Sequence, residues 1–347
     1  MPIKTTVADA NNATAIEIPT PREIKDFLDT RVVGQEEAKK TISVAIYNHY
    51  KRIISGRTDI KKTNVLLIGP TGCGKTEIAR AVAEIAGVPF CICDATTVTQ
   101  AGYVGDDVEN MLLRLLQAAD MDLEAAEQGI IYVDELDKIA RKSENASITR
   151  DVSGEGVQQS LLKIIEGSEV DVAITGGRKH PDCKDRVRFN TENVLFICGG
   201  AFEGLTMKRD EDSTIGFIES KNEESTEIEE KDLIKQGIIP ELIGRLPVIA
   251  RLNDLTLDDL KRILTEPENA ITKQYNELLS MDNVTLKWTD EALEFIAKKA
   301  KDKGTGARGL KSIIEKSMND LMFTIPGTEF EGEVIITVKN DNIVCEY

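Results

Sequence analysis

A glycine-rich segment at residues 69–76 constrains this chain more than any other feature. It reads G-P-T-G-C-G-K-T and fits G-x-x-x-x-G-K-[ST], the loop that cradles the phosphates of a nucleoside triphosphate. Its glycines let backbone N–H groups approach phosphate oxygens without a Cβ clash. Lys75 would supply a positive charge for the β- and γ-phosphates, and the Thr76 hydroxyl would ligate Mg²⁺. The predicted nucleotide-binding residues of this segment are Pro70, Thr71, Gly72, Cys73, Gly74, Lys75, Thr76 and Glu77.

The surroundings of this loop have the pattern of a strand followed by a helix. Residues 64–68 read as a buried strand, and residues 77–86 as a helix whose N-terminal dipole favours an anion. More apolar strands alternate with amphipathic helices further along the chain, which predicts an α/β fold with a parallel sheet covered by helices. The further strands are expected at 89–94, 128–135 and 193–198, and the helices at 35–54, 106–119 and 155–166.

Composition narrows the class of protein. A chain of 347 residues is long enough for two domains, and its 41% hydrophobic and 30% charged residues are typical of a globular protein. The net charge of −17 argues against nucleic acid as the main partner, since phosphate contacts need clustered Lys and Arg. Without a membrane-length apolar run or a secretory signal, we predict a cytoplasmic protein with no membrane partner.

The six cysteines do not suggest a metal site. No two are spaced as C-x-x-C. Cys91 and Cys93 should point to one face of the strand 89–94 and need not meet each other. We therefore expect buried thiols in a reducing compartment, and no zinc.

Shifts in composition predict the domain organisation. Residues 1–19 are polar and unpatterned, which predicts a disordered tail before a large domain at 20–252. Within that domain, the acidic segment 208–232 predicts a long mobile loop. A smaller α+β domain is expected at 253–347, where Thr256 and Asp259 have the spacing of a capping box. Its helices are expected at 258–279, 290–301 and 307–322, and its strands at 284–288 and 333–338.

Two acids follow the apolar strand residues 130–133. The C-terminal edge of an open parallel sheet is where ligands bind. Asp134 would hold Mg²⁺ together with Thr76, and Glu135 would polarise the attacking water. The alternative is an acidic strand end that is simply capped by solvent.

A second glycine pattern, G-x-G-x-x-G at residues 304–309, fits the dinucleotide-binding fingerprint by its letters alone. That fingerprint requires a preceding strand, whereas a helix precedes it here. We interpret it as a turn between two helices.

Seven further segments resemble the AAA+ ATPases, and within them the ClpX family of unfoldases. The resemblance runs from about residue 19 to about residue 337. It implies an ATP hydrolase that is not itself a peptidase. The segments lie at 19–24, 33–35, 101–105, 147–158, 176–180, 240–247 and 305–310.

The resemblance also implies roles around the nucleotide. Arg245 would be the arginine finger that reaches the γ-phosphate bound in a neighbouring subunit. Arg308 would be the second sensor, in contact with nucleotide from the small domain. Val32 and Val33 would line the adenine pocket. For both arginines the alternative is an exposed side chain without a ligand.

Other matched segments imply contacts with proteins. Tyr103 and Val104 resemble the pore loop that grips the translocating polypeptide; the alternative is a tyrosine packed in the core. Arg178, Lys179 and His180 resemble a basic loop at the pore entrance; the alternative is a solvated charge run. A third segment resembles the tripeptide that docks on the ClpP peptidase, namely Ile215, Gly216 and Phe217. The alternative is a weak tether onto the protein's own surface.

The resulting hypothesis is a homohexameric ring that uses ATP and Mg²⁺ to unfold tagged or unfolded proteins and thread them into ClpP. The family usually begins with a Cys₄ zinc-binding domain, but no cysteine precedes Cys73. An HslU-type unfoldase is one alternative, disfavoured because too few residues separate Lys75 from Asp134 for that family's inserted domain. A nucleic-acid-remodelling AAA+ ATPase and a nucleotide-binding scaffold without turnover are the others. No first-sensor residue is assigned, since the strand 193–198 runs into two glycines.

Overall fold

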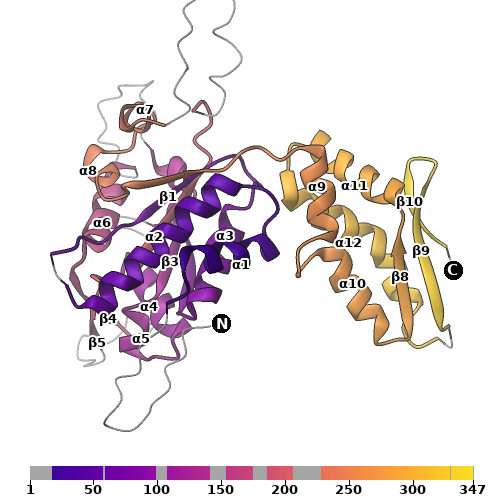
Figure 1. The fold of residues 1–347 in the computed structure, drawn as a ribbon, viewed down its shortest axis with the longest axis horizontal. Coiled ribbons are helices and arrows are strands. Elements are labelled where there is room, and N and C mark those ends of the chain that lie inside the picture. The colour runs from indigo at the N-terminus through magenta and orange to yellow at the C-terminus, as the bar shows by residue number, and fades with distance from the viewer. Residues whose placement is uncertain are drawn as a thin grey trace, which may run out of the picture. The chain divides into compact units, whose positions relative to one another are not determined.

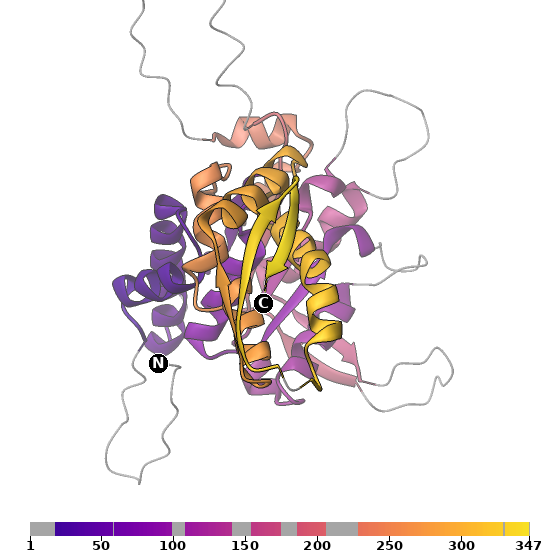
Figure 2. The same ribbon diagram turned by 90° about the vertical axis from the view of Figure 1, so that its right-hand side faces the viewer.

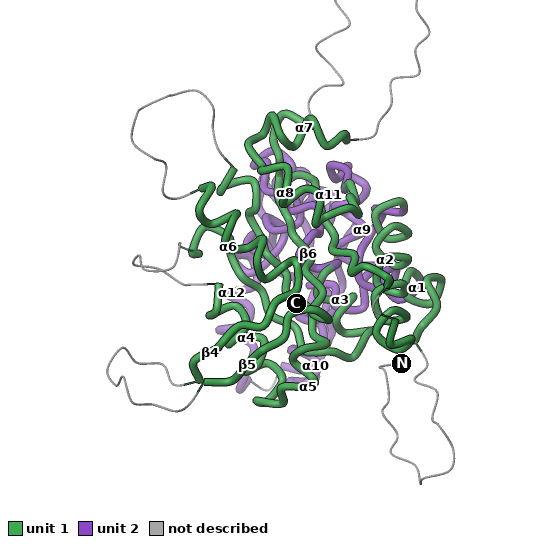
Figure 3. The backbone as a smooth tube through the Cα atoms, turned by 90° about the vertical axis from the view of Figure 1, so that its left-hand side faces the viewer, with its two compact units in different colours: residues 1–25, 37–70, 79–251 green, residues 26–36, 71–78, 252–347 purple. Residues whose placement is uncertain are grey.

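The computed structural model describes residues 18–57, 59–98, 108–140, 154–174, 186–205, 228–328 and 330–346. The chain forms two compact units (Figure 3). Unit 1 comprises the described parts of residues 1–25, 37–70 and 79–251. Unit 2 comprises residues 26–36 and 71–78 with the described part of 252–347. Most of the phosphate loop therefore groups with the C-terminal part of the chain.

Unit 1 is built on a five-stranded sheet in the order β2-β3-β6-β1-β7, and every pairing in it is parallel. All residues of β1 and β6 are buried, as expected for central strands covered on both faces. These observations confirm the predicted α/β class with a parallel sheet. The strands are β1 (Val65–Ile68), β2 (Phe90–Asp94), β3 (Ile130–Asp134), β6 (Leu195–Gly200) and β7 (Val248–Arg251).

Helices flank this sheet (Figure 1), and apolar side chains from both form a core. That core includes Leu66, Ile131 and Phe196 from the strands, with Leu112 and Leu161 from helices. A separate antiparallel pair joins β4 (Glu169–Ala173) to β5 (Arg186–Asn190). The helices assigned wholly to unit 1 are α4 (Val108–Ala118), α5 (Leu123–Ala126), α6 (Glu155–Glu166), α7 (Glu230–Lys235) and α8 (Pro240–Ile243). The short 3₁₀ helices are η1 (Ala95–Thr97) and η2 (Leu136–Ile139). Three longer helices contain residues of both units, namely α1 (Pro21–Arg31), α2 (Glu36–Ser55) and α3 (Lys75–Ala86).

Unit 2 has the smaller α+β architecture predicted for the C-terminal domain. Its three strands follow the order β10-β9-β8, with β8 and β9 parallel and β9 and β10 antiparallel (Figure 2). Leu260, Ile296, Ile314 and Val334 belong to its core. The elements are α9 (Leu257–Thr265), α10 (Ile271–Ser280), β8 (Val284–Trp288), α11 (Asp290–Asp302), α12 (Gly306–Thr324), β9 (Gly332–Lys339) and β10 (Asn342–Glu346).

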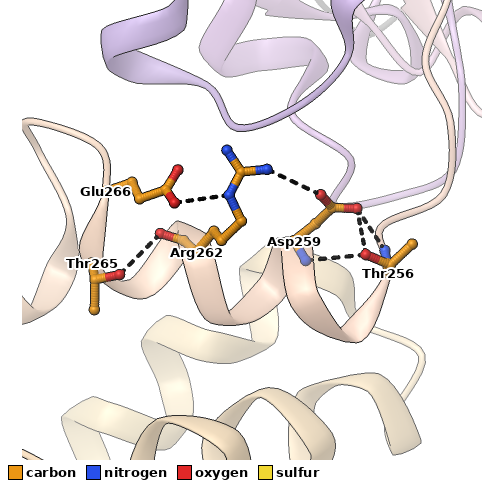
Figure 4. Close-up of polar contacts among 5 residues, drawn as sticks. All are labelled: Thr256, Asp259, Arg262, Thr265 and Glu266. Atoms are coloured by element: carbon orange, nitrogen blue, oxygen red, sulfur yellow. Dashed lines mark hydrogen bonds and ion pairs between the residues drawn. The ribbon is translucent and has the colours of Figure 1, made fainter. Parts of the chain in front are cut away.

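The predicted capping box at the start of α9 is present (Figure 4). The Thr256 hydroxyl accepts a hydrogen bond from the Asp259 N–H at 3.1 Å, and the Asp259 carboxylate accepts from the Thr256 N–H at 3.0 Å. Arg262 in the same helix donates to Glu266 at 2.8 Å. The box satisfies N–H groups that have no acceptor within the helix, and so fixes where α9 begins.

Most predicted elements agree with the structure within two residues at each end, and two predictions differ by more. The single helix expected at 258–279 is wrong, because α9 ends at Thr265 and α10 begins at Ile271. Pro267 lies between them, and proline has no N–H with which to continue the hydrogen bonds of the helix. Helix α7 begins at Glu230, inside the predicted loop 208–232; residues 206–227 lie outside the described part of the chain.

The cysteines of the described segments are free thiols. Cys91 and Cys93 share one face of β2, as predicted. Their side chains also hydrogen-bond, and this contact together with burial raises the pKa of Cys91 above its ordinary value. No helix in the described ranges combines the length and the apolar character needed to cross a bilayer.

Candidate nucleotide-binding site

The phosphate loop leaves the C-terminal end of β1. The Gly69 N–H donates to the Gly200 carbonyl of β6 at 3.2 Å, which extends the strand pairing into the start of the loop. Gly72 and Gly74 have φ values of +80° and +107°, a region that residues with a Cβ rarely adopt. A Cβ at Gly72 would also lie 2.6 Å from the Thr305 carbonyl oxygen. These two positions therefore require glycine, which fits the backbone cradle that a phosphate needs.

The charged and hydroxyl groups of the motif open helix α3. Lys75 is its first residue, and only 8% of the residue is exposed. Thr76 follows it, and the Glu77 carboxylate accepts a hydrogen bond from the Asn269 side chain at 2.9 Å. A largely buried lysine at the N-terminal end of a helix is suited to an anionic ligand.

The two valines predicted to line the adenine pocket lie beside the phosphate loop. Val32 and Val33 follow α1 and are 7% and 5% exposed. The Cγ1 atom of Val32 lies 3.6 Å from the position that a Cβ would take at Gly74. The structure therefore brings Val32 and the loop together within unit 2.

Gln35 was not singled out as a site residue in the sequence analysis. It is 8% exposed and has a φ of 59°. Its side-chain amide donates to the Asn253 carbonyl at 2.9 Å and accepts from the Asn253 N–H at 2.8 Å. A longer contact of 3.5 Å joins the same Nε2 to the Cys73 carbonyl of the phosphate loop. The sequence signal that could have identified Gln35 is its place in segment 33–35, one of the segments that resemble AAA+ ATPases.

The two acids after β3 occupy different backbone environments. Asp134 is the last strand residue, and its Oδ1 accepts from the Tyr132 hydroxyl at 3.1 Å and from the Glu135 N–H at 2.9 Å. Glu135 lies outside the strand, in a left-handed conformation with φ 58° and ψ 34°, and is exposed. Sequence reasoning placed both acids at the end of the strand but did not predict this turn.

Both acids lie at the same edge of the unit 1 sheet as the exit of β1. Strand β6 pairs with β3 on one side and with β1 on the other, all in parallel. Thr76 belongs to unit 2 and Asp134 to unit 1, so the Mg²⁺ site that they would share stays a prediction. Among the described residues, no group of three or more His, Cys, Asp or Glu could hold a metal ion.

The end of β6 explains why a polar first-sensor residue could not be assigned there. A Cβ at Gly199 would lie 2.2 Å from the Tyr132 hydroxyl oxygen, so glycine leaves the space that the tyrosine occupies. The adjacent Ala201 N–H donates to the Asp137 carboxylate at 3.0 Å. Tyr132, which reaches Asp134 from within the same strand, is a second residue that sequence reasoning missed.

The two predicted arginines are both exposed. Arg245 follows α8 in unit 1, and its Nε lies 2.8 Å from Glu166 Oε1 at the end of α6. Arg308 lies in the first turn of α12 in unit 2. It is part of the second glycine pattern, residues 304–309, which joins α11 to α12 as predicted and is not preceded by a strand.

The residues predicted to contact other proteins lie outside the described part of the chain. They are Tyr103 and Val104, then Arg178, Lys179 and His180, and the tripeptide Ile215, Gly216 and Phe217.

Comparisons with known proteins agree with the fold and with the phosphate loop. Residues 60–249 match the family model described as AAA domain (Cdc48 subfamily). Residues 255–328 match the C-terminal, D2-small domain, of ClpB protein. The two matched ranges correspond to the parallel sheet region and to the smaller α+β region, respectively.

Three similar relatives carry the name ATP-dependent Clp protease ATP-binding subunit ClpX. The protein from Treponema denticola is 54% identical over 337 residues, which cover 93% of this chain and 81% of that protein. Those from Borrelia duttonii and Borrelia recurrentis are each 52% identical over 351 residues, covering 96% of this chain and 82% of each relative. At this identity and coverage, the chain belongs to the ClpX family of AAA+ ATPases.

Proposed function

We propose that this chain is an ATP-dependent unfoldase that translocates protein substrates into a ClpP-type peptidase. The observation that carries this conclusion is the identity of more than half, over almost the whole chain, to Clp protease ATP-binding subunits named ClpX. The chain is an ATP hydrolase and is not itself a peptidase. Its phosphate loop and the two acids after β3 support the nucleotide chemistry.

The chemistry of the described residues supports a nucleotide and its metal ion as the ligands. The left-handed glycines of the loop, together with the largely buried Lys75, suit the β- and γ-phosphates. Thr76 and Asp134 would hold Mg²⁺, which supplies positive charge to the phosphate oxygens when bound. Glu135 would orient the attacking water and accept its proton, because its carboxylate is exposed while Asp134 is already hydrogen-bonded.

The active form would be a homohexameric ring, with the large domain at 20–252 and the small domain at 253–347. Arg245 would reach the γ-phosphate bound in the neighbouring subunit, and Arg308 would contact nucleotide bound in its own subunit. In the single chain, the Nε of Arg245 pairs with Glu166. Both side chains of that pair are 40% exposed or more, so its loss would cost little.

Substrate handling would depend on loops outside the described residues. Hydrolysis would move Tyr103 and Val104 along the ring axis, and the basic residues 178–180 would attract acidic tags or C-terminal carboxylates. Residues 215–217 would dock on ClpP. Activity in the cytoplasm is part of the same proposal.

Degradation of a tagged, folded reporter tests the function directly. With ATP, Mg²⁺ and ClpP, the wild-type chain is expected to degrade the reporter, and without ClpP to unfold it. The Glu135→Gln variant should bind ATP but lose hydrolysis by about 10²-fold or more, because the general base is removed. Glu124→Gln, an exposed acid in the first turn of α5, is the matched control and should behave as wild type.

Three results would contradict the assignment. Unchanged turnover in Glu135→Gln would remove Glu135 from the mechanism. Delivery to a different peptidase but not to ClpP would favour an HslU-type unfoldase. ATPase activity that rises strongly with added DNA and not with protein substrate would favour a nucleic-acid-remodelling enzyme.

A further inference from the structure

The tip of the phosphate loop is in direct backbone contact with the turn before α12. The Ala307 N–H donates to the Gly72 carbonyl at 3.1 Å. Gly72, Gly306 and Ala307 all belong to unit 2. Ala307 is the second residue of α12, so its N–H has no acceptor within the helix. The phosphate loop therefore supplies the acceptor that this helix end would otherwise lack.

Glycine on both sides makes this contact possible. A Cβ at Gly306 would lie 3.0 Å from the carbonyl oxygens of both Gly72 and Thr71. A Cβ at Gly72 would lie 2.6 Å from the Thr305 carbonyl oxygen. These neighbours are backbone atoms, which cannot move aside as the end of a flexible side chain can. The second glycine pattern thus has a packing role that its dinucleotide-like spacing did not indicate.

The contact fixes the direction of the next amide in the loop. In a trans peptide the C=O and the following N–H point in opposite directions. With the Gly72 carbonyl directed at Ala307, the Cys73 N–H points away from the turn. The Gln35 side chain makes a longer contact, of 3.5 Å, to the next carbonyl, that of Cys73. This contact favours a direction of the Gly74 N–H that points away from Gln35. Inward N–H groups are what a phosphate loop offers its ligand.

We propose that Gly306 and Ala307 are positioning residues for the phosphate loop. By holding the outward carbonyl of Gly72, they preset the Cys73 N–H for the nucleotide phosphates before the nucleotide binds. This inference rests on the proposed function in one respect, namely that the loop binds a nucleoside triphosphate. It assigns to Gly306 and Ala307 a part in ATP affinity, separate from any contact made by the Arg308 side chain.

The turn offers a matched pair of substitutions. Gly304 and Gly306 both have left-handed backbones, with φ values of +63° and +54°. A Cβ at Gly304 would meet nothing within 4 Å, whereas one at Gly306 would press on the phosphate loop. Gly304→Ala and Gly306→Ala therefore introduce similar backbone strain, and only the second displaces the loop.

Steady-state ATP hydrolysis by the full chain separates the two variants. Gly306→Ala is expected to raise the KM for ATP about tenfold, with kcat within about twofold, because one preset contact is lost before chemistry. Gly304→Ala should leave both constants within about twofold of wild type. A merely structural role would lower the thermal stability of both variants without this difference in KM. Equal KM values in the three proteins overturn the inference and leave the proposed function intact.

Two additions keep the test decisive. Calorimetric titration with ADP compares the same proteins without turnover, and the same tenfold difference is expected. Wild-type protein that binds no nucleotide would overturn the proposed function and this inference together. Ala307→Pro removes the donor at a helix position where proline is tolerated, so it replaces Gly306→Ala if that variant does not fold. An unchanged ADP affinity in a folded Ala307→Pro variant would likewise overturn the inference.

Discussion

Glu135 has a backbone conformation that residues other than glycine and asparagine seldom adopt. Such conformations cost roughly 1–3 kcal/mol and persist where the surroundings hold them. Here the Glu135 N–H donates to the Asp134 carboxylate at 2.9 Å, which ties the turn to the strand end. The turn leaves Glu135 exposed and Asp134 half-buried, so two adjacent acids acquire different environments.

Arg245 provides a prediction that separates a role in catalysis from a role in packing. Arg245→Ala should lower ATP hydrolysis by about 10³-fold or more if the arginine stabilises the transferring phosphate in a neighbouring subunit. Glu166→Gln removes the ion pair but keeps the arginine, and should change hydrolysis by less than about threefold, because exposed pairs contribute little. Phosphate release measured at saturating ATP and Mg²⁺ compares the two variants.

The comparison between these two variants is the control. If both lose hydrolysis equally, the pair itself matters, and Arg245 would be a structural residue of this subunit. If neither does, the arginine-finger assignment is wrong.

Single residues also show the limits of the sequence. The spacing of the phosphate loop and of the two acids could be predicted because local chemistry dictates it. The left-handed turn at Glu135 and the hydroxyl of Tyr132 beside Asp134 could not, since both depend on how neighbouring strands pack.

Helix α9 offers a test at the level of an element. Thr256→Ala removes the side chain that caps the helix, and should lower the free energy of unfolding by about 1 kcal/mol. Thr265→Ala, at the other end of α9, loses only a long contact of 3.5 Å to the Arg262 carbonyl, and should change it by less than about 0.5 kcal/mol (Figure 4). Urea denaturation of both variants without nucleotide measures the difference. Equal losses would mean that the capping box does not stabilise the helix.

Helix α2 buries a histidine against the connection before β6. His49 is 2% exposed, and its Nε2 lies 3.1 Å from the Asn193 carbonyl oxygen. A carbonyl can only accept, so Nε2 carries the proton of a neutral ring. Burial, with smaller contributions from the nearby Arg52 and Lys62 cations, lowers the pKa of His49 to about 3.

This histidine should make stability depend on pH. The unfolded chain takes up a proton below its ordinary pKa of about 6.5, whereas the folded chain does not until about pH 3. The stabilising contribution is therefore complete above pH 6.5 and is lost as the pH falls towards 3, by about 1.4 kcal/mol per pH unit. Urea denaturation from pH 7 to 4.5 should show this slope as a difference between wild type and His49→Gln. Parallel pH profiles of the two proteins would show that His49 is not buried in its neutral form.

The elements that the sequence predicted best have strong local signals. Helix α6 and strand β8 have the expected bounds, because their apolar periodicity is clear and their ends are well marked. Pro267 is the sequence signal for the break between α9 and α10. Strands β7 and β10 were not predicted, since short edge strands that are only partly buried carry a weak pattern.

For the whole molecule, the proposed docking tripeptide gives a prediction that uncouples two activities. Phe217→Ala should still unfold a tagged reporter with ATP but fail to support its degradation by ClpP, because an apolar anchor is lost while the motor is unchanged. Ile218→Ala, an apolar neighbour outside the tripeptide, is the control and should support degradation. Loss of unfolding itself in Phe217→Ala would place this residue in the motor instead.

The candidate site shows what a linear pattern cannot reveal about the assembled molecule. Residues 70–77 were predicted to bind nucleotide from their own motif, and Val32 and Val33 only through a resemblance; the structure brings Val32 beside Gly74. The bonds from Gln35 to Asn253 and from Ala307 to Gly72 join segments more than 200 positions apart. No local rule of spacing connects such segments, so only the folded chain identifies these partners.

The grouping of residues 71–78 with 252–347 has a practical consequence for dissecting this protein. A fragment that ended at Arg251 would retain the whole parallel sheet and every letter of the phosphate-binding motif. It would nevertheless lack Asn253, Asn269 and Ala307, the groups against which Gln35, Glu77 and Gly72 rest. A motif search would score that fragment as an intact ATPase, although its loop would have lost its scaffold.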